Sequence, residues 1–581
     1  MRGLGRVYPP FLKKMDFLNI KPKRLTEVWG VDKSREEWRG IVLGKGSFYK
    51  LDHISSYIWE NINGERSVKE IIGLICHLFP STDKKTIESD VIELLRKWEK
   101  EELISFDYKS LESYIENIYY NEYRNLGKDK VEILLASVPS SYPRDMILER
   151  LLRFPPLGIG YVTSFLKKFG FKTECIDLAV LDNRNIVIVL ENIIDKMSPK
   201  IIGFSVNTEQ INSAFALAKL CKKINPEIKI IFGGVHPTFM DKEILKNPNV
   251  DIVVRNEGEF TMLEIAKCIL HKEGDLKNID GISFKDDKGN IIRNKCRAFI
   301  ENLDEIPFPE RNFLIPNISK NRSSLPISTS RGCPYRCNFC AAGAMAGGKY
   351  RMRSPENVME EIRSLKKRGV KTFHFVDDTV TGIPKRVKEI CELLKPLDIE
   401  WTAESRVDVI SRDRELAKIM KDSGCIALQF GIESASQEIL DNANKKIKLE
   451  QIIKALEFAR GEGIHVAGSM IIGHPDDTYE SVKKSIDFAV ELQRKFGIAV
   501  FWGIFTPFPG TPVFENPELF GIKIHTYNFE EYIIPNAVIS TKYLNKDQLK
   551  WLYIEAVQKC AENLPSDWIN YIKERKAKGL I

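Results

Sequence analysis

Apolar and polar positions alternate along most of the chain in a way that predicts short strands followed by amphipathic helices. In a first block, from residue 131 to about 270, five apolar runs have the length of buried strands: 132–137, 174–178, 201–205, 228–232 and 251–254. The stretches between them carry apolar residues at helical spacing. Strands that alternate with helices favour an α/β fold with a doubly wound parallel sheet.

The same alternation resumes near residue 324 and forms a second block. Its predicted strands lie at 325–330, 372–376, 401–405, 427–432, 466–472 and 500–505. Six βα repeats suggest an open, partial (β/α)6 barrel. The residues after this block are irregular and then helical over 546–563.

The N-terminal region shows a different pattern, typical of a small and mostly helical unit. A short apolar strand at 47–51 leads into a helix over 54–62. Ser67, with Glu70 three residues later, forms a capping box for the next helix. A third helix carries apolar residues up to Trp98. On the pattern alone, this unit could be a helical cap that only packs on the rest of the chain.

These patterns divide the chain into five segments. We expect a winged-helix-like domain at 36–107, a polar linker at 108–130, the doubly wound sheet at 131–300, the partial barrel at 320–515 and a helical extension at 516–581. Ligands of open parallel sheets lie at the carboxyl ends of the strands. In the first sheet, the loops at those ends are 138–143, 205–208 and 233–237.

Composition narrows the class of protein. The 581 residues are 43% hydrophobic and 29% charged, as in a folded, soluble protein. The 87 basic and 80 acidic residues are mixed along the chain, so the formal charge of +7 gives no reason to expect a nucleic acid partner. No apolar run is long enough to span a membrane, and the first residues do not form a secretion signal. Eleven cysteines in so long a chain do not suggest a disulfide framework, so we expect a reducing cytoplasm.

The most informative residues are three cysteines in one short stretch, RGCPYRCNFC. Cys333, Cys337 and Cys340 directly follow a predicted strand. Thiolates are the usual ligands of iron–sulfur clusters, and three of them hold a 4Fe–4S cluster with one iron open to a substrate. The alternative is a structural zinc site. Zinc prefers four ligands, and no fourth Cys or His follows at short range.

This cysteine spacing, with Phe339 beside it, resembles that of the radical S-adenosylmethionine superfamily. The resemblance extends over residues 325–515, and the matching segments fit the cobalamin-binding branch: 351–355, 375–378, 403–408, 431–434, 473–475 and 506–512. It implies that the three cysteines are the metal ligands and the catalytic centre. It also implies that the open iron binds the amino and carboxylate groups of S-adenosylmethionine.

Several polar residues at the predicted strand ends suit S-adenosylmethionine. A carboxylate can accept from the methionine ammonium and an arginine can pair with its carboxylate, while other groups can contact the ribose or the adenine. The expected contact residues are Asp377, Asp378, Arg406, Glu433, Ser434 and Gly473. The alternative for each charged residue is a buried salt bridge between strands.

The first block resembles the cobalamin-binding domain of the same branch. The matching segments are 155–158, 176–177, 202–205, 232–238 and 257–259, and glycines at strand ends let the backbone approach a bulky corrin. The expected cobalamin contacts are Ser137, Tyr142, Pro156, Gly158, Ser205, Asn207, Gly233, Gly234, His236 and Glu257. The Asp-x-His-x-x-Gly motif that supplies a histidine ligand to cobalt is absent, so we expect cobalt to be bound without one. The alternative is a sheet that lost cobalamin and serves as a scaffold.

The N-terminal unit resembles the PqqD-like family of peptide-recognition domains. In that family a leader peptide adds as a strand to an exposed sheet edge, and residues 48–50 would form part of that edge. Winged-helix DNA-binding domains have a similar layout. The alternation of Glu and Lys in this unit, without a basic patch, argues against DNA.

Together these resemblances imply a radical enzyme that transfers a methyl group to an unactivated carbon of a ribosomally made precursor peptide. The implied partners are that peptide with its leader and an electron donor such as flavodoxin or ferredoxin. Cyclisation, crosslinking or rearrangement with the same cofactors is an alternative. A tRNA methylthiotransferase is less consistent, because Cys175, Cys221 and Cys268 are scattered rather than grouped as a second cluster motif. A peptide-binding scaffold without catalysis would leave the cysteine loop unexplained.

Overall fold

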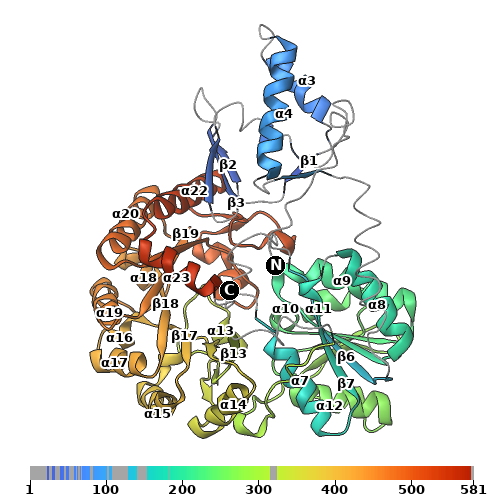
Figure 1. Cartoon of the computed structure of the whole chain (residues 1–581). Helices are drawn as coiled ribbons and strands as arrows, with labels where there is room; N and C mark the ends of the chain where they lie inside the picture. The colour runs from blue at the N-terminus through green and yellow to red at the C-terminus, as the bar shows by residue number, and fades with distance from the viewer. Residues whose placement is uncertain are drawn as a thin grey trace. The chain divides into compact units, whose positions relative to one another are not determined.

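The computed structural model of the protein describes residues 129–140, 154–181, 183–314 and 324–577, together with short parts of the first 106 residues. The chain forms two compact units. One comprises Met1–Tyr119 with Tyr142–Arg153, and the other comprises Tyr120–Ser141 with Phe154–Ile581. Figure 1 shows the elements of both.

The N-terminal unit combines a small antiparallel sheet with helices. Strands β2 (Trp29–Asp32), β3 (Arg39–Gly44) and β4 (Ser47–Leu51) pair in that order, and β1 (Pro22–Arg24) pairs with β5 (Ile104–Phe106). Helices α3 (Val68–Leu78) and α4 (Lys84–Lys100) share an apolar core in which Trp59 and Trp98 meet edge to face, 5.2 Å apart. The strand expected at 47–51 is confirmed. Most of the helix expected at 54–62, and all but the last two residues of the linker at 108–130, lie outside the described residues.

The first parallel sheet has the strand order β12-β11-β10-β9-β8-β6-β7 in the described part of the chain. The five strands expected from the sequence are confirmed within two residues: β6 (Ile133–Ser137), β7 (Thr173–Asp177), β8 (Ile201–Ser205), β9 (Lys229–Gly233) and β10 (Ile252–Val254). The sequence pattern missed an antiparallel hairpin at the edge, β11 (Ile282–Lys285) and β12 (Ile291–Arg293). Strand β12 is short and largely accessible, so it lacks the continuous apolar run by which the other strands were found.

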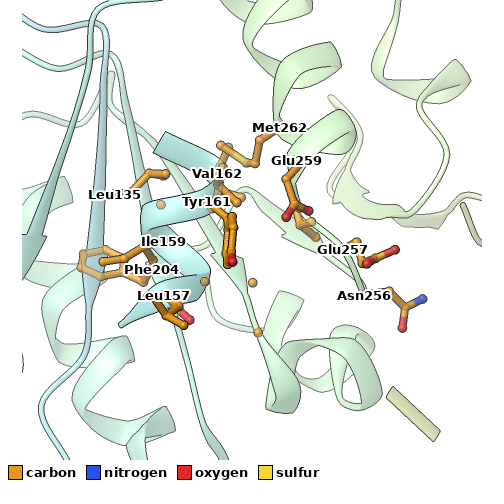
Figure 2. Close-up of a pocket in the computed structure, with 18 of the residues that line it drawn as sticks. Leu135, Leu157, Ile159, Tyr161, Val162, Phe204, Asn256, Glu257, Glu259 and Met262 are labelled. Atoms are coloured by element: carbon orange, nitrogen blue, oxygen red, sulfur yellow. The ribbon is translucent and has the colours of Figure 1, made fainter. Parts of the chain in front are cut away.

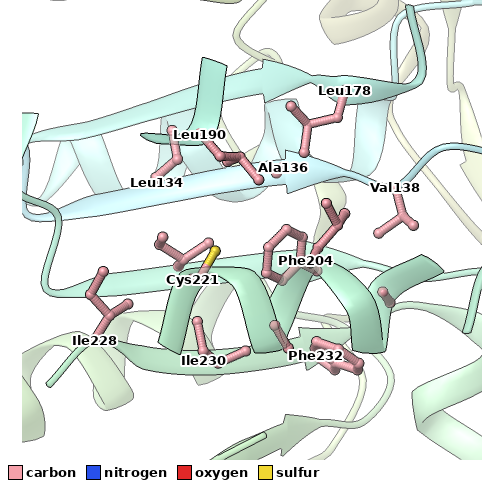
Figure 3. Packing of buried hydrophobic residues seen from close by; sticks show 14 of the residues in the cluster. Leu134, Ala136, Val138, Leu178, Leu190, Phe204, Cys221, Ile228, Ile230 and Phe232 are labelled. Atoms are coloured by element: carbon pink, nitrogen blue, oxygen red, sulfur yellow. The ribbon is translucent and has the colours of Figure 1, made fainter. Parts of the chain in front are cut away.

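Apolar side chains cover both faces of this sheet. On one face, α8 (Asn183–Met197) and α9 (Ile211–Ile224) pack on residues such as Leu134 and Phe204. Figure 3 shows Leu190 and Cys221 from these two helices pointing at the strands. On the other face, α7 (Leu157–Lys168) and α12 (Glu259–Ala266) form a second core. The strands are buried on both sides, so only the loops at their ends are free to bind a ligand.

The second parallel sheet is the open barrel. Its strands follow chain order: β13 (Ser324–Ile327), β16 (Thr372–Phe375), β17 (Glu400–Ser405), β18 (Cys425–Glu433), β19 (His465–Ile472) and β20 (Ala499–Ile504). Helices follow in the connections: α14 (Pro355–Lys367), α15 (Pro384–Leu394), α17 (Arg414–Asp422), α19 (Leu449–Gly461) and α20 (Tyr479–Phe496). Six parallel strands with helices between them are what the sequence predicted.

The first barrel strand is shorter than expected. Residues 325–330 were predicted as one strand, but β13 ends at Ile327. The backbone N–H groups of Thr329 and Ser330 instead donate to Oδ1 of Asp377, at 2.6 and 3.0 Å. The chain then forms a two-stranded ribbon, β14 (Ser330–Arg331) with β15 (Arg351–Met352), whose intervening loop carries the three cysteines.

The C-terminal helices pack against the barrel. Helix α22 (Lys546–Glu562) confirms the helix expected at 546–563, and α23 (Ser566–Ala577) follows it. Trp568 on α23 packs on Ala467 and Ala499, and Arg575 forms an ion pair with Glu400 at the start of β17. No helix in the described ranges is long and apolar enough to cross a membrane.

Candidate active site

The cysteine loop runs from β14 to β15, and because these two strands pair with each other, the two ends of the loop lie side by side. Cys333 and Cys337 are half-buried and Cys340 is exposed. The loop begins at Gly332, whose φ of +91° is a conformation that favours glycine. A Cβ at this position would also collide with Ala346 and with the carbonyl of Lys349. The chain therefore needs glycine at the point where it turns into the loop.

The three thiols share one electrostatic environment. Desolvation by the surrounding protein, with smaller contributions from the nearby thiols and Asp378, raises the pKa of Cys333 and raises that of Cys340 to about 11. Cys333 and Cys340 are therefore protonated in the protein without metal at neutral pH. Since thiolate is the metal-binding form, loading a metal centre must release protons.

The cysteines fit a cluster better than a single ion. Among the described residues, no three Cys, His, Asp or Glu side chains are gathered closely enough to hold one metal ion. The cysteines of a 4Fe–4S cluster bind different irons, so their sulfur atoms do not need to converge on one point. Three thiols on one accessible loop, without a fourth ligand, suit a cluster with an open iron rather than a closed zinc site.

Asp377 and Asp378 are adjacent but have different surroundings. Asp377 is buried, and its carboxylate accepts from the backbone and hydroxyl of Thr329 and from the backbone of Ser330. It therefore fixes the backbone that leads into the cysteine loop. Asp378 is exposed, but the protein around it removes part of its hydration. This desolvation, together with the negative charge of Asp377, raises the pKa of Asp378. Of the two, Asp378 is the carboxylate that faces the cysteines.

The expected residues on the later strands are also arranged in buried contacts. Glu433 ends β18 with a φ of +65° and forms a 2.6 Å ion pair with Lys445. A Cβ at Gly431 would overlap both partners, so glycine makes room for this pair. Arg406 pairs with Asp408 at 2.9 Å, donates to the carbonyl of Lys445 at 2.7 Å and lies 3.5 Å from the centroid of the Tyr335 ring.

Two other expected residues turn toward the helices. The hydroxyl of Ser434 accepts from the backbone of Ser436 and contacts the hydroxyl of Ser485 on α20. Gly473 has a φ of +89°, and its N–H donates to Asp477 at 3.0 Å. Their assignment as S-adenosylmethionine contacts stays a prediction, as it does for the charged residues above.

The structure adds two residues that sequence analysis did not select. Glu404 is exposed on β17, and its side chain makes no hydrogen bond or ion pair with any described residue. Partial loss of hydration, with the charges of Asp378 and Glu433, raises the pKa of Glu404 to about 7.

The second residue, His474, is 1% exposed, and neither ring nitrogen has a partner in the described part of the chain. Burial lowers the pKa of His474 to about 3. It packs edge to face on Phe339 of the cysteine loop. A signal for both was available, because Glu404 and His474 lie in the matching segments 403–408 and 473–475.

A cavity of about 360 Å³ lies at the carboxyl ends of the first sheet. Figure 2 shows Tyr161 and Val162 of α7, and Glu259 and Met262 of α12, around it. Five of the expected cobalamin residues line this cavity: Gly158, Ser205, Gly233, Gly234 and Glu257. The barrel contributes Ser328, Arg331 and Val376. The cavity is therefore shared by the sheet and the barrel.

The other expected cobalamin residues do not line the cavity. Ser137 donates to Asp177, Asn207 caps a turn and Pro156 precedes α7, while Tyr142 lies outside the described residues. His236 is 2% exposed, has Nδ1 3.3 Å from the hydroxyl of Thr208 and packs on Phe529, and burial lowers its pKa to about 4. The expectation that cobalt is bound without a histidine ligand stays a prediction.

The cavity has mostly apolar walls and a few polar groups, as suits a ligand that carries both kinds of surface. Leu135, Phe204 and Val254 line the cavity with apolar side chains, and the glycines leave space for a ligand at the strand ends. Gly234 has a φ of +107°, and its Cβ would lie 2.9 Å from the carbonyl oxygen of Val206. At Gly158 a Cβ would meet no atom within 4 Å and would extend into open space. The residues present therefore fit cobalamin.

Comparison with known proteins agrees with this geometry. Residues 327–489 match the model of the radical SAM superfamily, residues 143–266 match the B12 binding domain, and residues 39–104 match coenzyme PQQ synthesis protein D. An uncharacterized methyltransferase of Pyrococcus horikoshii is 35% identical over 74% of this chain and 92% of its own length. The chain belongs to the cobalamin-binding radical S-adenosylmethionine enzymes. Its cofactors are therefore a 4Fe–4S cluster, S-adenosylmethionine and cobalamin.

Two other similar proteins are named for different reactions. Anaerobic magnesium-protoporphyrin IX monomethyl ester cyclase of Rubrivivax gelatinosus is 28% identical over 68% of this chain and 72% of its own. The solved radical S-adenosylmethionine methyltransferase TsrM from Kitasatospora setae, with cobalamin and a 4Fe–4S cluster bound, has a TM-score of 0.59 at 16% identity, over 75% of this chain and 90% of that one. This similarity confirms the fold class of the sheet and the barrel. The domain boundaries expected from the sequence stay predictions.

Proposed function

We propose that this enzyme transfers a methyl group to an unactivated carbon of a ribosomally made precursor peptide. The observation that carries the peptide assignment is the match of residues 39–104 to the PqqD family, in a chain that also holds the radical and cobalamin domains. Methyltransferases among the similar proteins support the choice of methyl transfer.

The N-terminal unit offers a strand edge for a leader peptide. Strand β4 pairs with β3 on one side and is an outer strand of the described three-stranded sheet. Alternate residues along Phe48 to Lys50 therefore direct their backbone N–H and C=O groups to the other side. An extended peptide can add to such an edge by main-chain hydrogen bonds, whatever the sequence of the part to be modified.

The residues of the barrel bind and orient the reactants in this proposal. When bound, the cluster and cobalamin would supply the radical and methyl-transfer chemistry. S-adenosylmethionine would be the source of both the deoxyadenosyl group and the methyl group. Asp378, exposed beside the cysteines, accepts from the methionine ammonium. Asp377 holds the loop backbone, and the Glu433–Lys445 pair fixes charge next to the loop. Helices α22 and α23 cover the barrel and exclude water from it.

Cyclisation, crosslinking or rearrangement of the peptide is the second candidate, because a cyclase is among the similar proteins. A tRNA methylthiotransferase is less consistent, because Cys175 and Cys221 lie in the two apolar cores of the sheet rather than in a second cluster loop. We further propose that flavodoxin or ferredoxin supplies the electrons in the cytoplasm, where a reducing environment keeps cluster ligands reduced.

The test is anaerobic reconstitution of the full chain with iron, sulfide and cobalamin, followed by incubation with a candidate precursor peptide and methyl-labelled S-adenosylmethionine. Mass spectrometry should show a gain of about 14 mass units with unlabelled S-adenosylmethionine, increased by the mass of the label with the labelled compound, and deoxyadenosine and S-adenosylhomocysteine should form in step. The same peptide without its leader should react far less. Deoxyadenosine with a loss or no change of mass would establish the second candidate instead. No reaction of any peptide, with deoxyadenosine still formed, would overturn the peptide assignment.

A further inference from the structure

Both ends of the cysteine loop are held by the same carboxylate. Arg331 ends β14 just before the loop, and Arg351 begins β15 just after it. The two arginines are directly paired across the ribbon. Both also donate to Glu257, which lies in the loop between β10 of the cobalamin-binding sheet and α12. The 19 residues between them, 332–350, are thus closed into a loop at one point.

The contacts are short and mostly shielded from water. Arg331 donates through Nη1 to Glu257 at 2.7 Å and through Nη2 to Glu259 at 2.6 Å. Arg351 donates through Nη1 to both oxygens of Glu257, at 2.9 and 2.8 Å, and to the carbonyl of Ile300 at 2.7 Å. The arginine side chains are 22% and 6% exposed, and the glutamates 13% and 4%. Hydrogen bonds between ionised groups with good geometry and little water are strong and directional.

The same groups form part of the cobalamin cavity. Glu257, Glu259 and Arg331 all line it, and Figure 2 shows both glutamates at its edge. The guanidinium of Arg331 also lies 5.3 Å from the ring centroid of Tyr161, another lining residue. Direct ion pairs therefore join the cavity wall to the residues at both ends of the cysteine loop.

We propose that Glu257, Glu259, Arg331 and Arg351 are positioning residues that couple cobalamin binding to assembly of the cluster. Binding of the three cysteines to a cluster fixes the loop, and the loop fixes the arginines and thereby the two glutamates at the cavity. The cavity is then preorganised for cobalamin. Because coupling between two sites is reciprocal, cobalamin must also favour the loop conformation that holds the cluster. This role concerns the family's cofactors and holds whichever substrate is modified.

The test compares the cobalamin affinity of the full chain with and without its cluster, in wild type and in Arg331→Met. Hydroxocobalamin is titrated anaerobically, and its binding is followed by quenching of tryptophan fluorescence. In wild type, the dissociation constant should be at least ~5-fold lower with the cluster than without it. In Arg331→Met that ratio should fall to about one. The ratio is the readout, since the variant also alters the cavity wall and will change affinity in both states.

Two further variants keep the test decisive. Glu259→Gln removes one charged bond and keeps the side-chain shape, so it should lower the ratio only partly. Lys222→Met removes a 2.8 Å ion pair between α9 and Asp251, which precedes β10, away from the cavity and the loop, and should leave the ratio as in wild type. Hydrogen exchange of residues 332–350 in the cluster-free protein should slow on addition of hydroxocobalamin in wild type and not in Arg331→Met. A wild-type ratio of one, or an unchanged ratio in Arg331→Met, would refute the coupling, whatever the outcome with peptides.

Discussion

The two parallel sheets of this enzyme bury their strands in different ways. In the cobalamin-binding sheet, every residue of β6 and β10 is buried. In the barrel, β17 alternates strictly between buried residues such as Trp401 and accessible ones such as Thr402 and Glu404. The first sheet has helices on both faces, whereas the barrel has them on one face and keeps the other for its interior.

This difference separates two ways of building a site. A sheet covered on both faces can offer a ligand only its strand ends, so the cobalamin cavity is lined there by glycines and loop residues. A barrel has an open interior face, so polar groups can stand along the strands themselves, as Gln429 and Ser469 do with a 2.9 Å hydrogen bond. Mutations should therefore have different consequences in the two sheets.

The largest effect is expected at the cysteine loop. Cys337→Ala removes one of three cluster ligands, so deoxyadenosine formation should fall to the level of the reaction without enzyme, because no partial function remains without a bound cluster. The first sheet should still bind cobalamin with the affinity of the cluster-free protein. Iron content, absorbance and product analysis measure these effects. Cys296→Ser, at an exposed cysteine elsewhere, is the control and should leave all three unchanged.

The next largest effect is on stability, and it should differ between a core position of the first sheet and an interior position of the barrel. Leu134→Ala in β6 leaves a cavity under α8 and α9 and should cost about 2–5 kcal/mol of stability. Ser469→Ala on the barrel interior loses one hydrogen bond and should cost about 1 kcal/mol. The midpoints of chemical denaturation followed by circular dichroism rank the two variants. An equal loss in both would contradict the distinction drawn between the sheets.

A smaller effect on stability, with a clear effect on binding, is expected at the cavity. Gly158→Leu adds a side chain where no atom lies within 4 Å, so the fold should be kept while the side chain occupies cobalamin's space. The dissociation constant for hydroxocobalamin should rise about tenfold or more. Gly461→Leu on α19 also meets open space and is the matched control. If both variants bind cobalamin equally well, Gly158 does not border the bound ligand.

The smallest effect is a pH-dependent one in the barrel. The pKa of Glu404 is raised from an ordinary value of 4.5 to about 7, chiefly because the surrounding protein removes part of the hydration of its carboxylate. Between these values the folded protein binds more protons than the unfolded one, so this group lowers stability as the pH rises from about 4.5 through 7. Glu404→Gln should therefore match wild type at pH 4 and melt at a higher temperature at pH 8. Glu360→Gln, at an exposed position of α14, controls for net charge; an equal gain there would rule out a local effect.

Much of the fold followed from local sequence patterns. The parallel strands of both sheets were predicted because continuous apolar runs and regular alternation are local signals. The hairpin of β11 and β12 was missed because β12 gains its structure from a neighbour rather than from its own pattern. The end of β13 at Ile327 was misplaced because Asp377, about 50 residues later, takes the backbone donors of Thr329 and Ser330.

The sequence by itself determined the chemistry of this protein: three cysteines at fixed spacing, glycines at strand ends, and the order of its domains. Ligand spacing on one loop and backbone freedom at one residue are local properties, which is why they can be recognised without a structure. Tertiary structure decided how adjacent residues divide their roles, as Asp377 and Asp378 do. It also brought Glu257 to Arg331 and Arg351, 74 and 94 residues away. A carboxylate's partners depend on which strand ends meet in space, and no local pattern records that meeting.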